Sequence, residues 1–195
     1  VYSEDLKKDA GIIYIFPILA IFIILMLSST SIIYDKNTNF LTRVKVSSSP
    51  ILYILAKLIF FTALVTIQFV IILILFMLYG AQYAIQPLAL LQLILFIGII
   101  NTSLGLIIGL IANNEGIAVL FSLMISFPLM LISGIFFPTQ ALPKIIQWIS
   151  TVLPLHHQIT ATKQPLLFGQ TFQSTWVYFA IFLFFAIYYL IRKSE

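Results

Sequence analysis

Five long apolar runs, separated by short polar stretches, dominate the hydrophobic pattern of this chain. A helix needs roughly 20 predominantly apolar residues to cross the hydrocarbon core of a bilayer, and the runs are of about that length. We therefore predict an all-α, polytopic membrane protein with five transmembrane helices in a single domain, 1–195. The predicted spans are 12–34, 58–79, 88–112, 117–137 and 176–191.

The composition supports lipid as the main solvent. Hydrophobic residues make up 62% of the 195 residues and charged residues only 8%, whereas a soluble domain carries about 25% charged residues. The mean hydropathy is +1.13. The net charge of +4 is not clustered as in a nucleic-acid-binding surface, so we expect a lipid bilayer and no nucleic acid as partner. The sequence contains no cysteine, which excludes disulfides and thiolate metal sites.

The segment 35–57 holds the largest concentration of charge between the apolar runs. Apolar residues at helical spacing within it predict a short amphipathic helix on the membrane surface, which ends before three consecutive serines. Pro50 should open the next helix at its first turn. Lys57 is then expected in the interface, with its ammonium reaching toward water.

Small and polar residues share one face of the third run. Gly98, Asn101, Gly105 and Gly109 recur at steps of three and four residues, a pattern that lets helix backbones approach closely in lipid. We favour helix packing over a pore for this face. Asn101 and Gln68 are the strongly polar side chains predicted deep in the bilayer, and they either line a path for cargo or form hydrogen bonds between helices.

Proline and serine residues shape the fourth run. Pro128 lies in its middle and should kink it, either as a hinge or as a static bend. Ser122, Ser126 and Ser133 lie near one face and are expected to satisfy the backbone groups that the proline frees. Asn114 is the candidate N-cap residue of this run.

The fourth run ends in a segment rich in aromatic and proline residues. Its distinctive residues are Ser133, Gly134, Phe137, Pro138 and Pro143. The end of this segment overlaps an amphipathic stretch, 139–153. This stretch is too short to cross a bilayer, so we predict an external interfacial or re-entrant helix.

A polar stretch, 154–174, precedes the last run, and it contains His156 and His157. Adjacent histidines on a helix point apart, and no further ligands accompany them, so we predict an interfacial or loop pair and no metal site.

Alternation of five spans divides the basic residues between two sides. The side that carries more basic residues near the ends of the spans is favoured as the cytoplasmic side. This side holds Lys36, Arg43, Lys45, Lys57, Arg192 and Lys193, against Lys7, Lys8, Lys144 and Lys163 on the other. In a cell membrane this places the N-terminus outside and the C-terminus in the cytoplasm. Residues 1–10 are expected to be a solvated lead-in.

Two sequence patterns carry a resemblance to a known family. One is Ser48–Ser49–Pro50, followed by an apolar helix opening and Lys57. The other is Ser133–Gly134 with Phe137–Pro138, then Leu142–Pro143 and Leu153–Pro154–Leu155. The chain resembles the membrane subunit of an ABC-2 type exporter, a family with six such helices, of which the first is absent here. In this family a cluster of acidic and basic residues often precedes the surface helix. In this chain that cluster consists of Asp35–Lys36 alone.

The resemblance implies an outward-moving permease for an apolar or lipid-linked substrate. Two such subunits would pair as a homodimer or heterodimer, and a separate ABC ATPase subunit would bind ATP and Mg, so that this chain needs no cofactor and is not an enzyme by itself. The coupling residues would be Asp35, Lys36, Phe40, Arg43, Ser49 and Pro50. The translocation path or the helix packing would involve Gln68, Asn101, Gly105, Gly109 and Pro128.

Two other classes of function remain open at this point. One is a secondary transporter or channel that works without ATP, although no carboxylate lies inside any predicted span. The other is a membrane enzyme or scaffold that uses the two adjacent histidines. A phosphate-binding loop of the Gly-x-x-x-x-Gly-Lys-Ser/Thr type is absent from the sequence, so ATP would be bound elsewhere.

Overall fold

The computed structural model describes residues 2–47, 50–79, 86–133 and 143–167, and most of these residues lie in helices. The all-α fold class is confirmed. The helices are α1 (Tyr2–Asn37), α2 (Phe40–Ser47), α3 (Pro50–Leu78), α4 (Pro87–Ile111), α5 (Glu115–Ile132), α6 (Lys144–Val152) and α7 (Pro154–Leu167).

Four of these helices are long and apolar enough to cross a membrane. They are α3, α4, α5 and the part of α1 from Ile13 to Asn37. The predicted fifth span, 176–191, lies outside the described residues. The chain therefore has the architecture of a multi-pass membrane protein, with four candidate spans in its described part.

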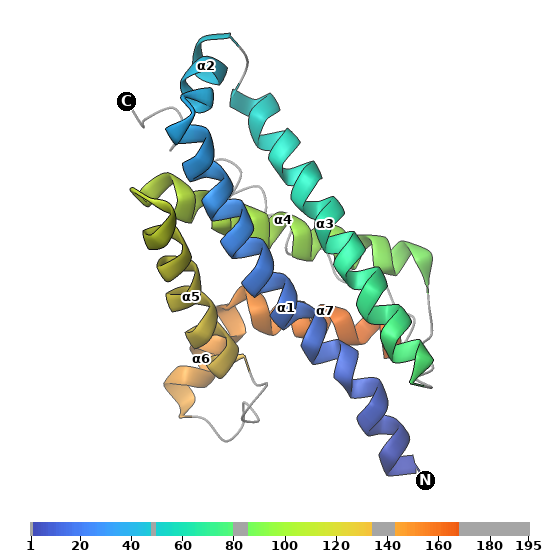
Figure 1. Ribbon diagram of the computed structural model, residues 1–195. Helices are drawn as coiled ribbons and strands as arrows, with labels where there is room; N and C mark the ends of the chain where they lie inside the picture. Colours follow the sequence, from blue (N-terminus) through green and yellow to red (C-terminus); the bar gives the residue numbers. More distant parts are fainter. Residues whose placement is uncertain (1, 48–49, 80–85, 134–142, 168–195) are drawn as a thin grey trace.

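Helix α1 is the centre of the bundle. It runs across the molecule in Figure 1 and packs most extensively against α4, and then against α5, α3 and α7. Ile13, Phe16, Ala20 and Ile24 are buried at helical spacing along its inner face. This face meets α3 directly, since the rings of Phe16 and Phe69 lie edge to face at 4.7 Å.

The beginning of α1 differs from the prediction. Residues 1–10 were expected to be a solvated lead-in, but the helix already begins at Tyr2, so Pro17 lies in its interior. No glycine or proline precedes Gly11, and nothing in this polar stretch therefore stops the helix from extending. The other end closes with a tight turn, in which Asn39 has φ 55° and its N–H donates to the carbonyl of Lys36. Asparagine tolerates this left-handed conformation.

The boundaries around the predicted surface helix lie close to the prediction, although α2 includes the first of the three serines. Helix α2 ends at Ser47, and Pro50 is the first residue of α3. The latter is one continuous helix of 29 residues, longer than an untilted span requires. Lys57 therefore lies on the same helix that crosses the membrane.

Helix α5 begins as predicted, but its serines form other hydrogen bonds than those expected. The Asn114 side chain accepts a hydrogen bond from the Ile117 N–H at 2.8 Å, which confirms the N-cap. The helix continues through Pro128. The Ser122 hydroxyl, however, donates to the carbonyl of Ala118 at 2.8 Å.

The expectation that three serines satisfy the groups freed by Pro128 is wrong. That proline leaves the carbonyl four residues earlier without its helical donor. Ser133 donates instead to the carbonyl of Met130, and the Ser126 hydroxyl has no partner among the described residues. Ser122 and Ser133 bond to their own helix because a serine hydroxyl in a helix reaches the carbonyl three or four residues before it.

The largest difference from the prediction is α7. Residues 154–167 were expected in a polar interfacial or loop segment, yet they form a helix that packs against α1 and α4. Leu155, Gln158, Ile159 and Thr162 are buried. Their spacing gives α7 an inward face, so its polar residues lie partly inside the bundle. Figure 1 shows α7 crossing beneath α1, next to the amphipathic α6.

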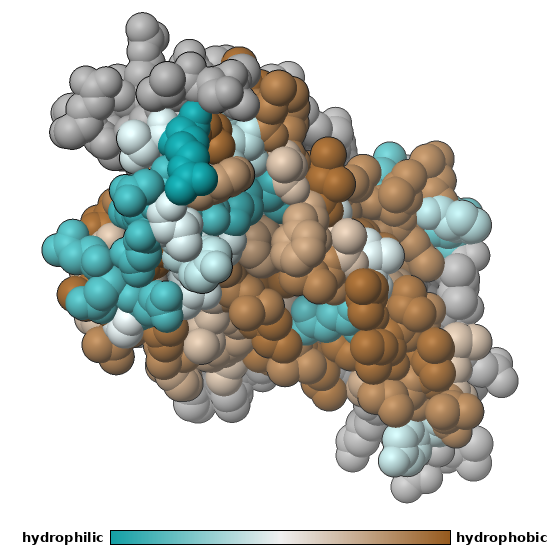
Figure 2. Space-filling model, turned by 45° about the horizontal axis from the view of Figure 1, so that its top comes forward, coloured by the Kyte–Doolittle hydropathy of each residue, from teal (hydrophilic) through white to brown (hydrophobic). Residues whose placement is uncertain are grey.

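The surface separates into polar and apolar regions. Figure 2 shows hydrophilic residues gathered toward the end of the bundle that carries α2, beside a broad apolar surface. Many large hydrophobic residues of α3 are exposed, among them Ile59 at 71% and Leu78 at 78%. An apolar surface of this extent fits contact with lipid or with another membrane helix.

Candidate functional site

Polar contacts join the helix ends at the α2 end of the bundle. The Lys36 ammonium of α1 donates to the carbonyls of Gly109 at 2.8 Å, Leu110 at 2.7 Å and Ala112 at 3.2 Å. These carbonyls belong to the last turn of α4, where the helix leaves acceptors without intrahelical donors. A cation is also favoured there by the helix dipole. Lys36 thus fixes the end of α1 to the end of α4.

A second polar group joins α1 to α3. One carboxylate oxygen of Asp35, Oδ2, accepts a hydrogen bond from the Tyr53 hydroxyl at 2.5 Å and forms an ion pair with the Lys57 ammonium at 2.7 Å. Lys57 also donates to the Ser31 hydroxyl. Asp35 is only 8% exposed. We call Ser31, Asp35, Tyr53 and Lys57 the α1–α3 polar cluster.

Helix α2 rests on this cluster through its apolar face. Leu41 and Val44 are buried in a small core with Tyr53 and Ile54 of α3. The rings of Phe40 and Tyr53 lie 6.2 Å apart. Arg43 is exposed. The helix therefore has one side fixed to α1 and α3, and another that is open to a partner.

The predicted coupling residues gather at this end. Asp35 and Lys36 end α1, Phe40 and Arg43 lie on α2, and Pro50 begins α3. Ser49 lies outside the described residues.

The glycine face of α4 lies against its neighbours. A Cβ atom placed on Gly98 would come within 2.7 Å of the Thr62 side chain on α3. On Gly109 it would collide with the backbone of α1 at Ser29, and on Gly105 it would meet the Ser28 side chain. These contacts favour helix packing over a pore for the glycine face.

The two polar residues predicted deep in the bilayer have different surroundings. Asn101 is fully buried and exchanges hydrogen bonds with Gln158 of α7, in which the Gln158 amide donates at 2.8 Å and the Asn101 amide donates at 3.4 Å. Gln68 has no hydrogen-bond partner among the described residues. Its side chain lines an apolar groove of about 380 Å³ between α1 and α3. For Asn101 the geometry favours interhelical hydrogen bonding.

Replacing Gln158 by leucine is expected to lower the free energy of unfolding by about 1–3 kcal/mol, because the buried Asn101 amide loses both partners. Denaturant unfolding in detergent micelles, followed by circular dichroism, measures this change. The double variant Asn101→Leu/Gln158→Leu should be more stable than Gln158→Leu, since it leaves no orphaned amide. A double variant less stable than the single one would contradict this assignment.

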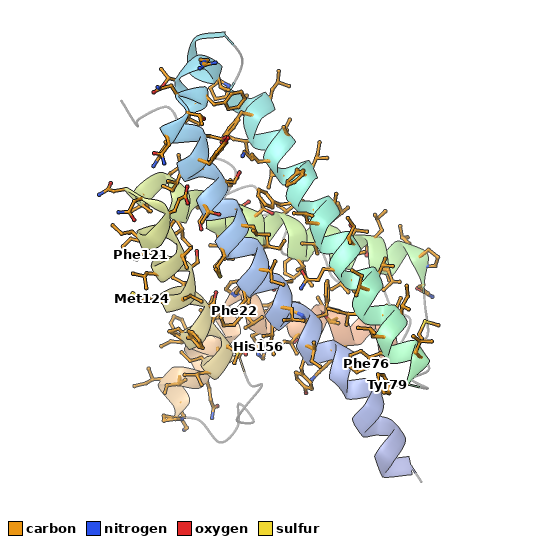
Figure 3. All side chains as sticks on the ribbon, viewed as in Figure 1. Phe22, Phe76, Tyr79, Phe121, Met124 and His156 are labelled. Carbon is orange, nitrogen blue, oxygen red and sulfur yellow. The ribbon has the colours of Figure 1, made fainter. Side chains whose placement is uncertain are left out.

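The segment 133–143, for which an external position was predicted, is described at both of its ends. Ser133 is the C-cap residue of α5, and its carbonyl lies 3.4 Å from Nδ1 of His156 on α7. Figure 3 labels His156. Pro143 is the N-cap residue of α6. Helix α6, Lys144–Val152, lies within the stretch 139–153 for which an interfacial or re-entrant helix was predicted. Gly134, Phe137 and Pro138 lie outside the described residues.

The adjacent histidines lie on a helix, not in a loop. The rings of His156 and His157 are perpendicular, with centroids 5.5 Å apart. Within the described part of the chain, no three His, Cys, Asp or Glu residues come together as a metal site requires.

Sequence reasoning missed two parts of these contacts. Tyr53 and Gln158 were not singled out, yet each bonds to a residue that was. Tyr53 and Lys57 are four residues apart and therefore share a face of α3. Asp35 lies shortly before them in the sequence, near the end of α1. The shared face of Tyr53 and Lys57 and this nearby acid could therefore have predicted the cluster. Gln158 offered no such signal, because its partner is 57 residues away.

The fold and these contacts define a multi-pass, all-helical membrane protein whose spans are joined at one end by a surface helix. A family model described as ABC-2 type transporter matches residues 2–167. The chain belongs to this family.

One curated relative is the ABC transporter G family member 20 of Dictyostelium discoideum, which is 32% identical over 91 residues. The aligned part is 46% of this chain and 12% of the relative. The chain therefore matches only a small part of that protein. No solved structure matched the chain.

Proposed function

We propose that this chain is the membrane-spanning part of an ATP-driven exporter, moving an apolar or lipid-linked substrate outward. The observation that carries the proposal is the family match over 2–167. These 195 residues contain no phosphate-binding loop, so ATP and Mg would be bound outside them, in our proposal by an ABC ATPase subunit. A second permease subunit would complete the pathway as a homodimer or heterodimer.

In this proposal α2 receives the movement of the ATPase. Its buried face contacts α3 through Leu41 and Val44, and the neighbouring end of α1 is bonded to α3 and α4. A displacement of α2 would therefore act on three candidate spans together. Rigid displacement of packed helices is a common form of switching between two states.

The proposed orientation places the α2 end in the cytoplasm. Lys36, Arg43 and Lys57 lie at this end, and basic residues near span ends favour the cytoplasmic side. Helices α6 and α7 follow the opposite end of α5, so they would face the exterior. The C-terminus would then be cytoplasmic and the N-terminus external.

Replacing Arg43 by glutamate tests the role of α2. We expect about a tenfold loss of ATP-dependent transport, because an exposed arginine at a protein interface often contributes more than 1 kcal/mol and the charge reversal repels an acidic partner. The measurement is transport into vesicles that contain the chain and its co-purified ATPase.

Thr42→Ala is the matched control, since Thr42 is the exposed neighbour of Arg43 on α2. This variant should transport normally, and both variants should unfold like the wild type. If Arg43→Glu transported at the wild-type rate, α2 would not be the surface that receives the ATPase.

A further inference from the structure

A cavity of about 590 Å³ opens between α1, α2 and α3 beside the α1–α3 polar cluster. Its size lies within the range of about 300–1,000 Å³ that is usual for ligand sites. Its walls combine aromatic and charged side chains from all three helices. The residues that matter here are Tyr34, Asp35, Phe40, Tyr53, Lys57 and Phe60.

The charged groups of this cavity are not fully used by the protein. The Lys57 ammonium has three N–H donors, and two of them go to Asp35 and Ser31. Both contacts of the Asp35 carboxylate are made by Oδ2, so Oδ1 receives none from the described residues. The Lys57 ammonium also lies 5.5 Å from the centre of the Tyr53 ring. Among the described residues, one N–H of Lys57 therefore has no oxygen partner and Oδ1 of Asp35 accepts no hydrogen bond. Together the two residues carry no net charge.

Aromatic side chains surround this pair. Tyr34, Phe40 and Phe60 are 63%, 46% and 59% exposed, although all three are large hydrophobic residues. Aromatic faces attract ammonium and quaternary ammonium groups, and a lysine ammonium is a common ligand of phosphate. The cavity can thus receive a positive group among its rings, close to Asp35, and a phosphate at Lys57.

In the proposed orientation the start of α3 lies at the cytoplasmic membrane surface, which would place the cavity near the boundary between headgroups and acyl chains. Lys57 is seven residues from Pro50, the first residue of α3, which places it about 10 Å along that helix. Interfacial helices reach about 5–10 Å into the same boundary. Farther along α3, the exposed Ile67 and Ile71 continue the apolar surface in the direction of the bilayer core.

We propose that this cavity binds the headgroup of one zwitterionic phospholipid, with its phosphate on Lys57 and its ammonium among the aromatic rings near Asp35. An anionic phospholipid is disfavoured, since it would bring uncompensated negative charge to Asp35. A free phosphate ester would leave the exposed rings uncovered. The site does not depend on how transport is driven.

Native mass spectrometry tests the site on the full chain, purified in detergent with any co-purifying subunits and mixed with phosphatidylcholine or phosphatidylglycerol of identical acyl chains. We expect one tightly held phosphatidylcholine per chain, retained about tenfold more than phosphatidylglycerol. Soluble glycerophosphocholine at the same concentration should not displace it.

The variant Phe60→Ala removes a wall of the cavity but no member of the polar cluster. Phosphatidylcholine retention should fall at least fivefold in this variant. The matched control is Ile59→Ala, whose side chain is exposed on the same turn but does not line the cavity. Lys57→Met should also lose the lipid preference. Equal retention of both lipids by the wild type, or equal retention by Phe60→Ala and Ile59→Ala, would overturn the proposal.

Discussion

Replacing Asp35 by alanine is expected to lower the free energy of unfolding by about 3 kcal/mol. The substitution leaves the Lys57 ammonium, 18% exposed in its side chain, without its carboxylate. Removing one partner of a buried ion pair typically costs about 3–5 kcal/mol. The Tyr53 hydroxyl loses its acceptor at the same time. Denaturant unfolding in mixed micelles, followed by circular dichroism, measures the change.

A double variant separates the ion pair from the packing. Asp35→Leu/Lys57→Met should be more stable than Asp35→Ala, because replacing a buried pair by apolar residues is often close to neutral. A loss of about 1 kcal/mol should remain, since Tyr53 still lacks an acceptor. Glu115→Ala is the control for removing a carboxylate, because Glu115 is an exposed acid at the same end of the bundle.

This control should lose less than 1 kcal/mol, which is the size of a favourable charge at a helix N-terminus. An equal loss in Asp35→Ala and Glu115→Ala would contradict the structural role of the α1–α3 polar cluster.

Replacing Gly109 by leucine is expected to prevent the close packing of α1 and α4. Even a Cβ atom there would collide with the Ser29 carbonyl and lie 2.8 Å from Cβ of Ile32. The first obstacle is backbone, so it cannot rotate away as a side chain could. Overpacking commonly costs about 1–3 kcal/mol, and a leucine at a backbone contact belongs at or above the upper end. We expect little folded, monodisperse protein after purification.

A smaller substitution at the same position gives a change in stability that can be measured. Gly109→Ala should lose about 1–3 kcal/mol of unfolding free energy, for the same collision. The control is Gly116→Ala at the exposed start of α5, where an added Cβ has only the Asn114 side chain nearby, at 3.5 Å. It should be neutral or slightly stabilising. Wild-type stability in Gly109→Ala would show that the two helices do not pack through this face.

Local signals in the sequence were sufficient for two helix starts. Pro50 predicted the start of α3, and Asn114 predicted the N-cap of α5, because each acts through its own backbone or the next turn. The small residues Gly105 and Gly109 predicted a packing face for the same reason, since their spacing alone places them together.

Contacts between distant segments could not be predicted in this way. Residues 154–167 were expected in a polar interfacial or loop segment, because their polar side chains suggested contact with water. The partner that makes burial of Gln158 favourable is Asn101, on a helix far away in the sequence. Lys36 was expected to couple to a partner subunit, and the structure adds that its ammonium caps α4. Both contacts depend on where complete helices pack, which the hydrophobic pattern alone does not specify.

The most direct test of the central proposal is the energy source of transport. The chain is purified from its native membrane with any bound subunits and reconstituted in vesicles, and movement of a panel of fluorescent lipids and lipophilic dyes is followed with and without Mg-ATP. We predict that an ATPase co-purifies and that at least one probe moves only while ATP is hydrolysed. Transport by the chain alone under an ion gradient, without nucleotide, would contradict the account.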